Sequence, residues 1–150
     1  MYLVSDWMTK GPVTLREHDE LGTAAALFKL GRVRHLPVVR GGKLVGLVTQ
    51  RDLLRALGSR ARAGERTTPV KTLMRTSLFT AHPTTPLREV ALAMLKKKIG
   101  CVPVVGVGKK LLGIVTEADL VRLAAQVLED VDRMDSLVGE VTRRPRRARR

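Results

Sequence analysis

The chain has 150 residues, of which 44% are hydrophobic and only 3% aromatic, so we expect a packed globular protein with an aliphatic core. Its apolar runs stay below the roughly 20 residues that cross a bilayer, Asp6 interrupts the start of the chain, and a single cysteine excludes an intramolecular disulfide. These features predict a cytoplasmic protein without a membrane partner or a metal site, and the formal charge of +14 directs attention to anionic partners.

The first half of the chain predicts a strand, a helix, two strands and a second helix. Residues 12–15 (PVTL) form a short extended segment. The next segment has the i, i+3, i+4, i+7 spacing of an amphipathic helix, with apolar residues at Leu21, Ala24, Ala25 and Phe28. The later elements are expected at LPVV (36–39), at KLVGLVT (43–49) after a glycine turn, and from about Gln50 onward.

The second half predicts the same elements in the same order. LFTA (78–81) forms the extended segment, and the helical spacing returns at Leu87, Val90, Ala91 and Met94. VPVV (102–105) and KLLGIVT (110–116) form the next two strands, and a helix is expected from about Glu117. Acidic and apolar residues alternate through 126–142, which predicts an extension of that helix.

The last eight residues, RRPRRARR (143–150), carry six positive charges and no acid. Because like charges repel and cannot be buried, we expect this tail to be disordered. Two interpretations stay open. The tail could bind nucleic acid through counterion release, or it could be a solvated arm that keeps the protein soluble.

The two halves are copies of one unit. Met8 and Thr9 align with Met74 and Arg75 at an offset of 66 residues, and a one-residue insertion in the hairpin turn raises the offset to 67. We therefore predict a mixed α/β (α+β) fold of two β-α-β-β-α repeats with pseudo-twofold symmetry. The expected boundaries are repeat 1 at 1–58, a linker at 59–68, repeat 2 at 69–134, and a C-terminal extension with the Arg-rich tail at 135–150.

A heptad recurs in the two repeats, as GLVTQRD (46–52) and GIVTEAD (113–119). Its glycine, Gly46 or Gly113, lies inside a predicted strand. Glycine weakens a strand, so its presence there indicates the close approach of a backbone or a ligand.

Each heptad also places a threonine where a strand ends and an aspartate three residues later. Thr49 and Thr116 suit the N-cap position of the following helix, and Asp52 and Asp119 suit its first turn, where the helix dipole favours a carboxylate. Helix capping is therefore one explanation. A ligand site is the other, because helix N-termini bind anions and a carboxylate can accept hydrogen bonds from ribose hydroxyls.

The VSDWMT opening (4–9), the LPVV and VPVV strands and the two heptads together resemble a tandem pair of CBS domains, the regulatory module named after cystathionine beta-synthase. The resemblance covers about residues 3–58 and 69–125. It implies two repeats that pair through their sheets into a Bateman module, commonly as a homodimer. It also implies clefts between the repeats that bind an adenine nucleotide (AMP, ADP or ATP) or S-adenosylmethionine, with no required cofactor.

In this family each cleft is completed crosswise by both repeats, and the resemblance assigns its residues accordingly. Asp52 and Asp119 would hold ribose hydroxyls, while Thr49 and Thr116 would contact ribose or phosphate. The first cleft would combine Thr116 and Asp119 with Thr9, Val13, Thr14, Val33, Arg34 and His35. The second would combine Thr49 and Asp52 with Phe79, Thr80, Ile99, Gly100 and Cys101.

This assignment makes the two clefts electrostatically different. Arg34 and His35 give the first cleft basic side chains that suit a phosphate, whereas Gly100 and Cys101 give the second cleft space without charge. We therefore hypothesise that the first cleft prefers a phosphorylated nucleotide. The alternatives are a solvated Arg34 and a partly buried, structural His35.

Catalytic triads, paired catalytic carboxylates and phosphate-binding glycine loops are absent from the sequence, so we expect a protein that is not an enzyme. The expected function is regulatory: an adenosine-containing ligand binds between the repeats, and the resulting conformational change is sensed by an effector protein. The alternative is a nucleic-acid-associated protein that binds through its basic tail, with the repeats as scaffold or switch. A structural dimer without a ligand is a third possibility.

Overall fold

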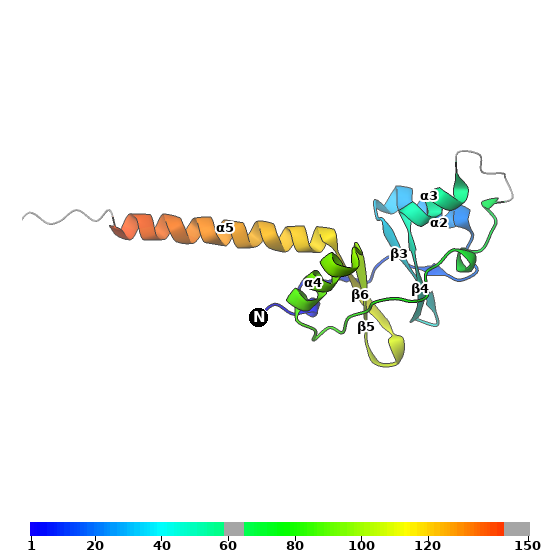
Figure 1. Cartoon of the computed structure of the whole chain (residues 1–150), viewed down its shortest axis with the longest axis horizontal. Coiled ribbons are helices and arrows are strands. Elements are labelled where there is room, and N and C mark those ends of the chain that lie inside the picture. The colour runs from blue at the N-terminus through cyan, green and yellow to red at the C-terminus, as the bar shows by residue number, and fades with distance from the viewer. Residues whose placement is uncertain (59–64, 143–150) are drawn as a thin grey trace, which may run out of the picture.

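Two three-stranded sheets, each flanked by helices, form the two halves of the molecule (Figure 1). The computed structural model describes residues 1–58 and 65–142. The elements are α1 (Val4–Trp7), β1 (Thr9–Lys10), β2 (Leu15–Arg16), α2 (Leu21–Gly31), β3 (His35–Arg40), β4 (Lys43–Thr49), α3 (Gln50–Leu57), η2 (Val70–Thr72), α4 (Leu87–Lys97), β5 (Cys101–Val105), η3 (Val107–Lys109), β6 (Leu111–Thr116) and α5 (Glu117–Thr142). The strand orders are β2-β3-β4 and β1-β6-β5.

The predicted fold class is confirmed. Helices α3 and α5 begin at Gln50 and Glu117, as the sequence indicates. The strands β3-β4 and β5-β6 form the two expected antiparallel hairpins. In the second half the first predicted strand is reduced to a single parallel bridge between Ala81 and Val104.

Each half has its own aliphatic core, and the helical spacings account for both. The apolar face of α2 is buried through Leu21, Ala24 and Phe28, and that of α4 through Leu87, Val90 and Met94. A smaller cluster of Leu47, Cys101 and Ile114 takes residues from both halves, so it joins the two sheets.

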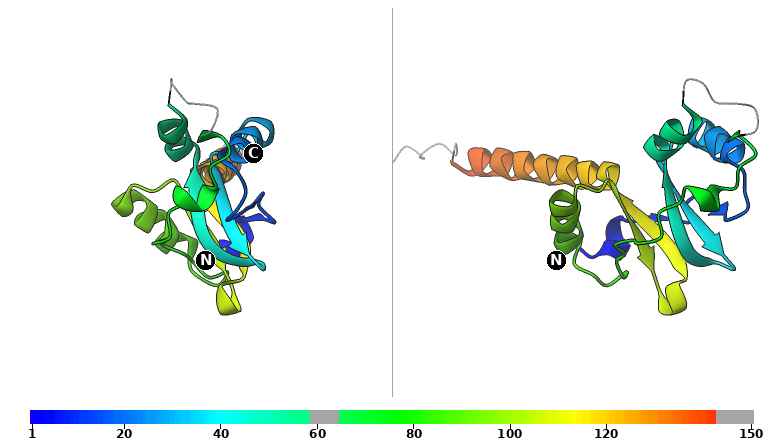
Figure 2. Two further views of the ribbon diagram at one scale, coloured as in Figure 1. Left: turned by 90° about the vertical axis from the view of Figure 1, so that its right-hand side faces the viewer. Right: turned by 45° about the vertical axis from the view of Figure 1, so that its right-hand side comes forward.

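Short segments at the start of each repeat are exchanged between the halves. We call residues 3–10 and 69–76 the lead-in segments. Val4 is fully buried in the core of the second half, and Thr9 pairs with Ile114 of β6. Val70 is fully buried in the core of the first half, and Arg75 forms a bridge with Leu47 of β4. The sequence repeats therefore differ from the halves in space, and Figure 2 shows the N-terminal segment beside α4.

The heptad glycines make this exchange possible. A Cβ on Gly113 would lie 2.7 Å from the Thr9 carbonyl oxygen and 2.8 Å from the Met8 sulfur. A Cβ on Gly46 would lie 2.6 Å from the Met74 sulfur and 3.1 Å from the Arg75 carbonyl oxygen. The close approach predicted from the sequence is thus made by a lead-in segment of the protein itself.

Helix α5 continues far beyond the second half, through Thr142 (Figure 1). The extension predicted over 126–142 is therefore helical. The tail at 143–150 and linker residues 59–64 lie outside the described residues. None of the described helices is long and apolar enough to cross a membrane.

Replacing Gly113 with alanine is expected to lower the free energy of unfolding by about 1–3 kcal/mol, because the new methyl group overlaps the Thr9 backbone. Gly31→Ala is the matched control, since a Cβ there meets its nearest neighbour, Val33, at an ordinary 3.5 Å. Urea unfolding of both variants measures the difference. Equal stability of the two variants would contradict the packing of the lead-in segment against β6.

Candidate functional site

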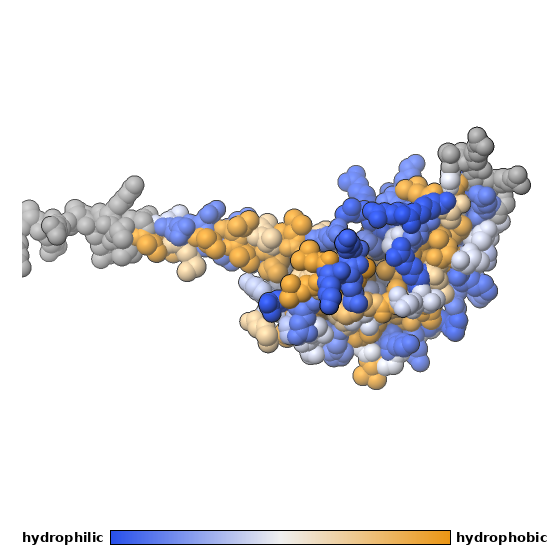
Figure 3. Space-filling view, viewed as in Figure 1, coloured by the Kyte–Doolittle hydropathy of each residue, from blue (hydrophilic) through white to orange (hydrophobic). Residues whose placement is uncertain are grey.

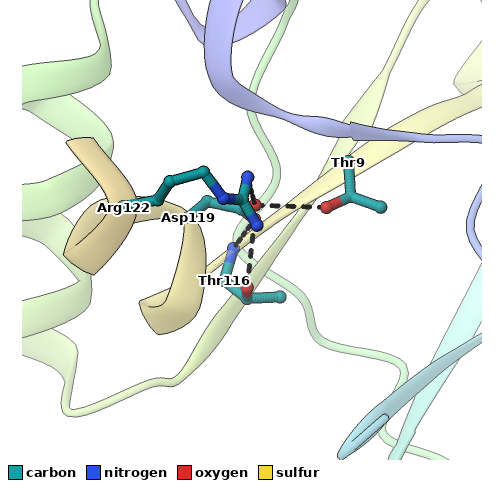
Figure 4. Close-up of polar contacts among 4 residues, drawn as sticks. All are labelled: Thr9, Thr116, Asp119 and Arg122. Carbon is teal, nitrogen blue, oxygen red and sulfur yellow. Dashed lines mark hydrogen bonds and ion pairs between the residues drawn. The ribbon is translucent and has the colours of Figure 1, made fainter. Parts of the chain in front are cut away.

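The Asp119 carboxylate is buried at the first turn of α5, with 1% of its surface exposed. One oxygen accepts hydrogen bonds from the backbone N–H of Thr116 at 2.8 Å and from its hydroxyl at 3.0 Å. The other oxygen accepts the Thr9 hydroxyl at 3.2 Å and the Arg122 guanidinium at 3.1 Å (Figure 4). Four donors thus hold this carboxylate, and one of them comes from the lead-in segment of the other repeat.

Asp52 occupies the equivalent place at the first turn of α3, and its partner is an arginine. Arg75 donates to both carboxylate oxygens, at 3.0 Å from Nε and 2.9 Å from Nη2. The Asp52 backbone N–H donates to the Thr49 hydroxyl at 3.1 Å, which makes Thr49 the N-cap of α3. Burial raises the pKa of Asp52, but the hydrogen bonds from Arg75 and Thr49 outweigh it, and the pKa lies below its usual value.

Arg75 is a site residue that the sequence analysis missed. The sequence does contain a pattern that indicates Arg75 as a site residue. Arg75 aligns with Thr9 at the repeat offset, and Thr9 is assigned to the cleft with Asp119. The structure gives both residues the same place, each hydrogen-bonded to the aspartate of the opposite repeat. Helix capping therefore explains the contacts between the threonine and the aspartate of each heptad. It does not explain the hydrogen bond that each aspartate accepts from the opposite repeat.

A cavity of about 810 Å³ opens beside Thr49, within the range usual for small-molecule sites. It contains several residues assigned to the second cleft, namely Thr49, Phe79, Ile99, Gly100 and Cys101. Basic side chains dominate its charged lining, with Glu117 as the acid: Arg34, Arg51, Arg75, Lys97 and Lys98. His35, Leu47, Gln50, Leu54, Ser77, Leu78 and Pro103 complete the wall. Such a lining suits an anionic ligand with an apolar portion.

The placement of Arg34 and His35 in the other cleft was wrong. β3 begins at His35, which pairs with Thr49 at the end of β4, and the Gln50 N–H donates to the Arg34 carbonyl oxygen at 2.9 Å. These backbone contacts keep both residues beside the threonine of their own repeat. The cavity with Thr49 is consequently basic, contrary to the expectation that Gly100 and Cys101 leave it without charge.

The remaining predicted residues lie outside this lining. Asp52 is covered by Arg75, and Thr80 is exposed next to Phe79. Thr9, Thr116 and Asp119 come together at the start of α5. Of the others predicted to join them, Val13 is exposed, Thr14 is half-buried, and Val33 packs against the core of the first half.

The starts of β3 and β5 lie close together in the lining of the cavity. A Cβ on Gly100 would lie 3.3 Å from His35 Nε2 and 3.5 Å from the Glu117 carboxyl carbon, so Gly100 leaves room for both side chains. Burial, followed by the charge of Arg34, lowers the pKa of His35 below its usual value. The imidazole is therefore neutral at pH 7 and available for hydrogen bonding.

Cys101 packs as a small apolar residue, as the sequence indicates, and is 4% exposed. Burial, followed by the charge of Asp119, raises the pKa of its thiol to about 12, so it remains a thiol at neutral pH. Within residues 1–58 and 65–142, no group of three or more His, Cys, Asp or Glu side chains could hold a metal ion.

The family assignment rests on both repeats. The family model of the CBS domain matches residues 4–59 and 70–126, so the chain belongs to the CBS domain family, with two such domains in tandem. A CBS domain-containing protein of Bacillus subtilis, YhcV, is 34% identical over 80% of this chain and 84% of its own length. L-aspartate semialdehyde sulfurtransferase of Methanocaldococcus jannaschii is 34% identical over 81% of this chain, which spans only 23% of that enzyme.

Solved structures share the fold over most of this chain. A Vibrio cholerae protein named as an acetoin utilization protein (AcuB) has a TM-score of 0.79 and is 39% identical. The match covers 89% of this chain and 97% of that protein's chain. The CBS domain pair of MJ0100, in complex with 5′-methylthioadenosine and S-adenosyl-L-methionine, has a TM-score of 0.74 and 33% identity over 84% and 98%. CBSX2 in complex with AMP has a TM-score of 0.76 and 29% identity over 85% and 98%.

The lowered pKa of His35 predicts a pH dependence of stability. The unfolded chain takes up a proton near pH 6.5 and the folded chain only at lower pH, so the folded state loses stability as the pH falls below about 6.5. The free energy of unfolding of the wild type, minus that of His35→Gln, should therefore decrease between pH 7 and pH 5. A difference that stays constant or increases on acidification contradicts a buried, neutral His35.

Proposed function

We propose that this chain is a regulatory protein, not an enzyme, that binds an adenosine-containing ligand in the cavity beside Thr49. The observation that carries the proposal is the lining itself: Thr49 at the N-terminus of α3, apolar side chains, and several cations around one cavity. Asp52, in the first turn of the same helix, lies behind Arg75, which lines the cavity. The complexes of MJ0100 and CBSX2 with adenosine-containing ligands support the ligand class. AMP, ADP and ATP are the forms that best suit the positive charge, and S-adenosylmethionine is the further candidate.

The ligand's parts correspond to different parts of the lining. Ribose hydroxyls donate to Asp52 and contact Thr49 at the start of α3. Phosphate oxygens accept from cations such as Arg34 and Lys98, and arginine can do so with two parallel hydrogen bonds. The base packs against apolar side chains such as Phe79 and Ile99.

Arg75 couples ligand binding to the other repeat. Its guanidinium donates to both oxygens of Asp52 and covers the carboxylate, and in this proposal the ribose hydroxyls take its place there. Its side chain also lines the cavity, where a phosphate is an alternative partner. Because Arg75 belongs to the lead-in segment of the second repeat, this exchange moves a segment that spans both halves. A population shift of that kind is what an effector protein senses.

The residues around Asp119 form a second, weaker candidate site. Thr9 and Thr116 have the places that the family pattern gives to ligand contacts, but their hydroxyls and the Arg122 guanidinium all donate to Asp119. A ligand there has to replace these bonds. We therefore propose that the cavity beside Thr49 is occupied first.

Isothermal titration calorimetry with AMP and ATP tests the proposal. Asp52→Ala should weaken binding on the order of 10-fold or more, because it removes the charged acceptor of the ribose hydroxyls. Asp119→Ala should leave the tighter binding event unchanged. Asp132→Ala, an exposed aspartate on α5, is the control for the loss of one negative charge. Undetectable binding of every adenine nucleotide and of S-adenosylmethionine to the wild type would sink the proposal.

A further inference from the structure

His35 is the side chain of the cavity beside Thr49 that can change its charge near neutral pH. It lies in the lining at the start of β3 and is half-buried. Histidine is the residue whose ordinary pKa falls between pH 5 and 8, so small changes in its surroundings decide its charge. The other two histidines of the chain, His18 and His82, are exposed and lie outside this lining. A charge that enters the cavity therefore acts on His35 first.

The surroundings of His35 keep the ring neutral at pH 7. Burial is the largest effect and lowers its pKa, and the positive charge of Arg34 lowers it further. The carboxylates of Glu117 in α5 and Asp52 in α3 raise it by less. The start of β5 adds no charge, because Cys101 remains a thiol there. An added negative charge therefore shifts the balance toward the protonated ring.

Glu117 lies close enough to His35 to stabilise a charged ring. A Cβ on Gly100 would lie 3.3 Å from His35 Nε2 and 3.5 Å from the Glu117 carboxyl carbon, so both groups border the same small space. Within residues 1–58 and 65–142, Glu117 forms no ion pair with an arginine or a lysine. A proton on His35 therefore gains a carboxylate on one side of the ring.

Cations line other parts of the cavity and attract an anion to the same place. Arg34 directly precedes His35 in the chain, Arg51 lies in α3, and Lys97 and Lys98 lie at the end of α4. Figure 3 shows strongly hydrophilic surface between the two halves of the molecule, around the end of α4. A phosphate bound by Arg34 comes close to the neighbouring ring, and a negative charge within about 4–6 Å favours the protonated form of a histidine.

We propose that the anionic ligand of this cavity binds together with a proton on His35, so that acidification tightens its binding. This inference rests on the nucleotide proposal and adds the regulation of the same site by pH. His35 takes the proton from the solvent when the phosphate enters. The charged ring then lies between two negative groups, the phosphate of the ligand and the carboxylate of Glu117.

The sign of the pH dependence follows from this linkage. The complex holds a proton that the free protein does not, so the affinity rises as the pH falls through the pKa of His35 in the complex. The rise ends below the pKa of His35 in the free protein, where both states are protonated. Each unit between these two pKa values corresponds to about a tenfold change in affinity.

Nuclear magnetic resonance of the histidine rings, on the full chain, tests the proposal directly. The pKa of His35 should rise when the protein is saturated with AMP, whereas adenosine, which lacks the phosphate, should not raise it. His18 and His82 are the internal controls, and their pKa values should stay constant. If AMP binds and leaves the pKa of His35 unchanged or lower, or if adenosine raises it equally, this inference alone is overturned. If AMP does not bind, the nucleotide proposal is overturned as well.

Calorimetry with AMP between about pH 8 and pH 6 tests the effect on affinity. On acidification the affinity of the wild type should rise relative to that of His35→Gln, by about threefold or more. The phosphate of AMP titrates equally in both experiments, so the ratio reports His35. Glu117→Gln should move this rise to lower pH, because it removes the carboxylate that stabilises the charged ring. Parallel pH profiles for the wild type and His35→Gln overturn the proposal.

Discussion

The fold depends on one crosswise interaction, made twice. Each repeat sends its lead-in segment to the other half, where a side chain binds the aspartate at the first turn of the last helix. Thr9 binds Asp119 and Arg75 binds Asp52. Because both carboxylates are largely buried, they need hydrogen-bond donors in the folded state, and each receives donors from the other repeat. Arg75, which makes one of these contacts, also lines the candidate site.

This constraint makes the two equivalent positions chemically different. Threonine at the first position contributes one hydroxyl to a carboxylate that also binds Thr116 and Arg122. Arginine at the second position covers a carboxylate beside an open, basic cavity. The two repeats are similar, but the residue at the lead-in position distinguishes a carboxylate held by four donors from one bound to an arginine beside a cavity. The asymmetry we expected from Arg34 and Gly100 thus arises from Thr9 and Arg75 instead.

The repeat, the order of elements and the helix starts could be predicted because periodicity and capping are local. The glycines Gly46 and Gly113 also indicated a close approach, although a backbone and a methionine make it rather than a ligand. The assignment of Arg34 and His35 failed because it depends on how β3 and β5 meet, which no local pattern encodes. The helical conformation of residues 126–142 was likewise predictable, but the exposure of every residue from Ala124 to Val138 was not.

The central claim is that Asp52 exchanges its arginine for a ribose. A crystal structure of the protein grown with AMP measures this directly. The account predicts nucleotide in the cavity beside Thr49, ribose hydroxyls within hydrogen-bond distance of Asp52, and Arg75 turned away from that carboxylate. Nucleotide bound elsewhere, with the ion pair between Asp52 and Arg75 intact, would contradict it.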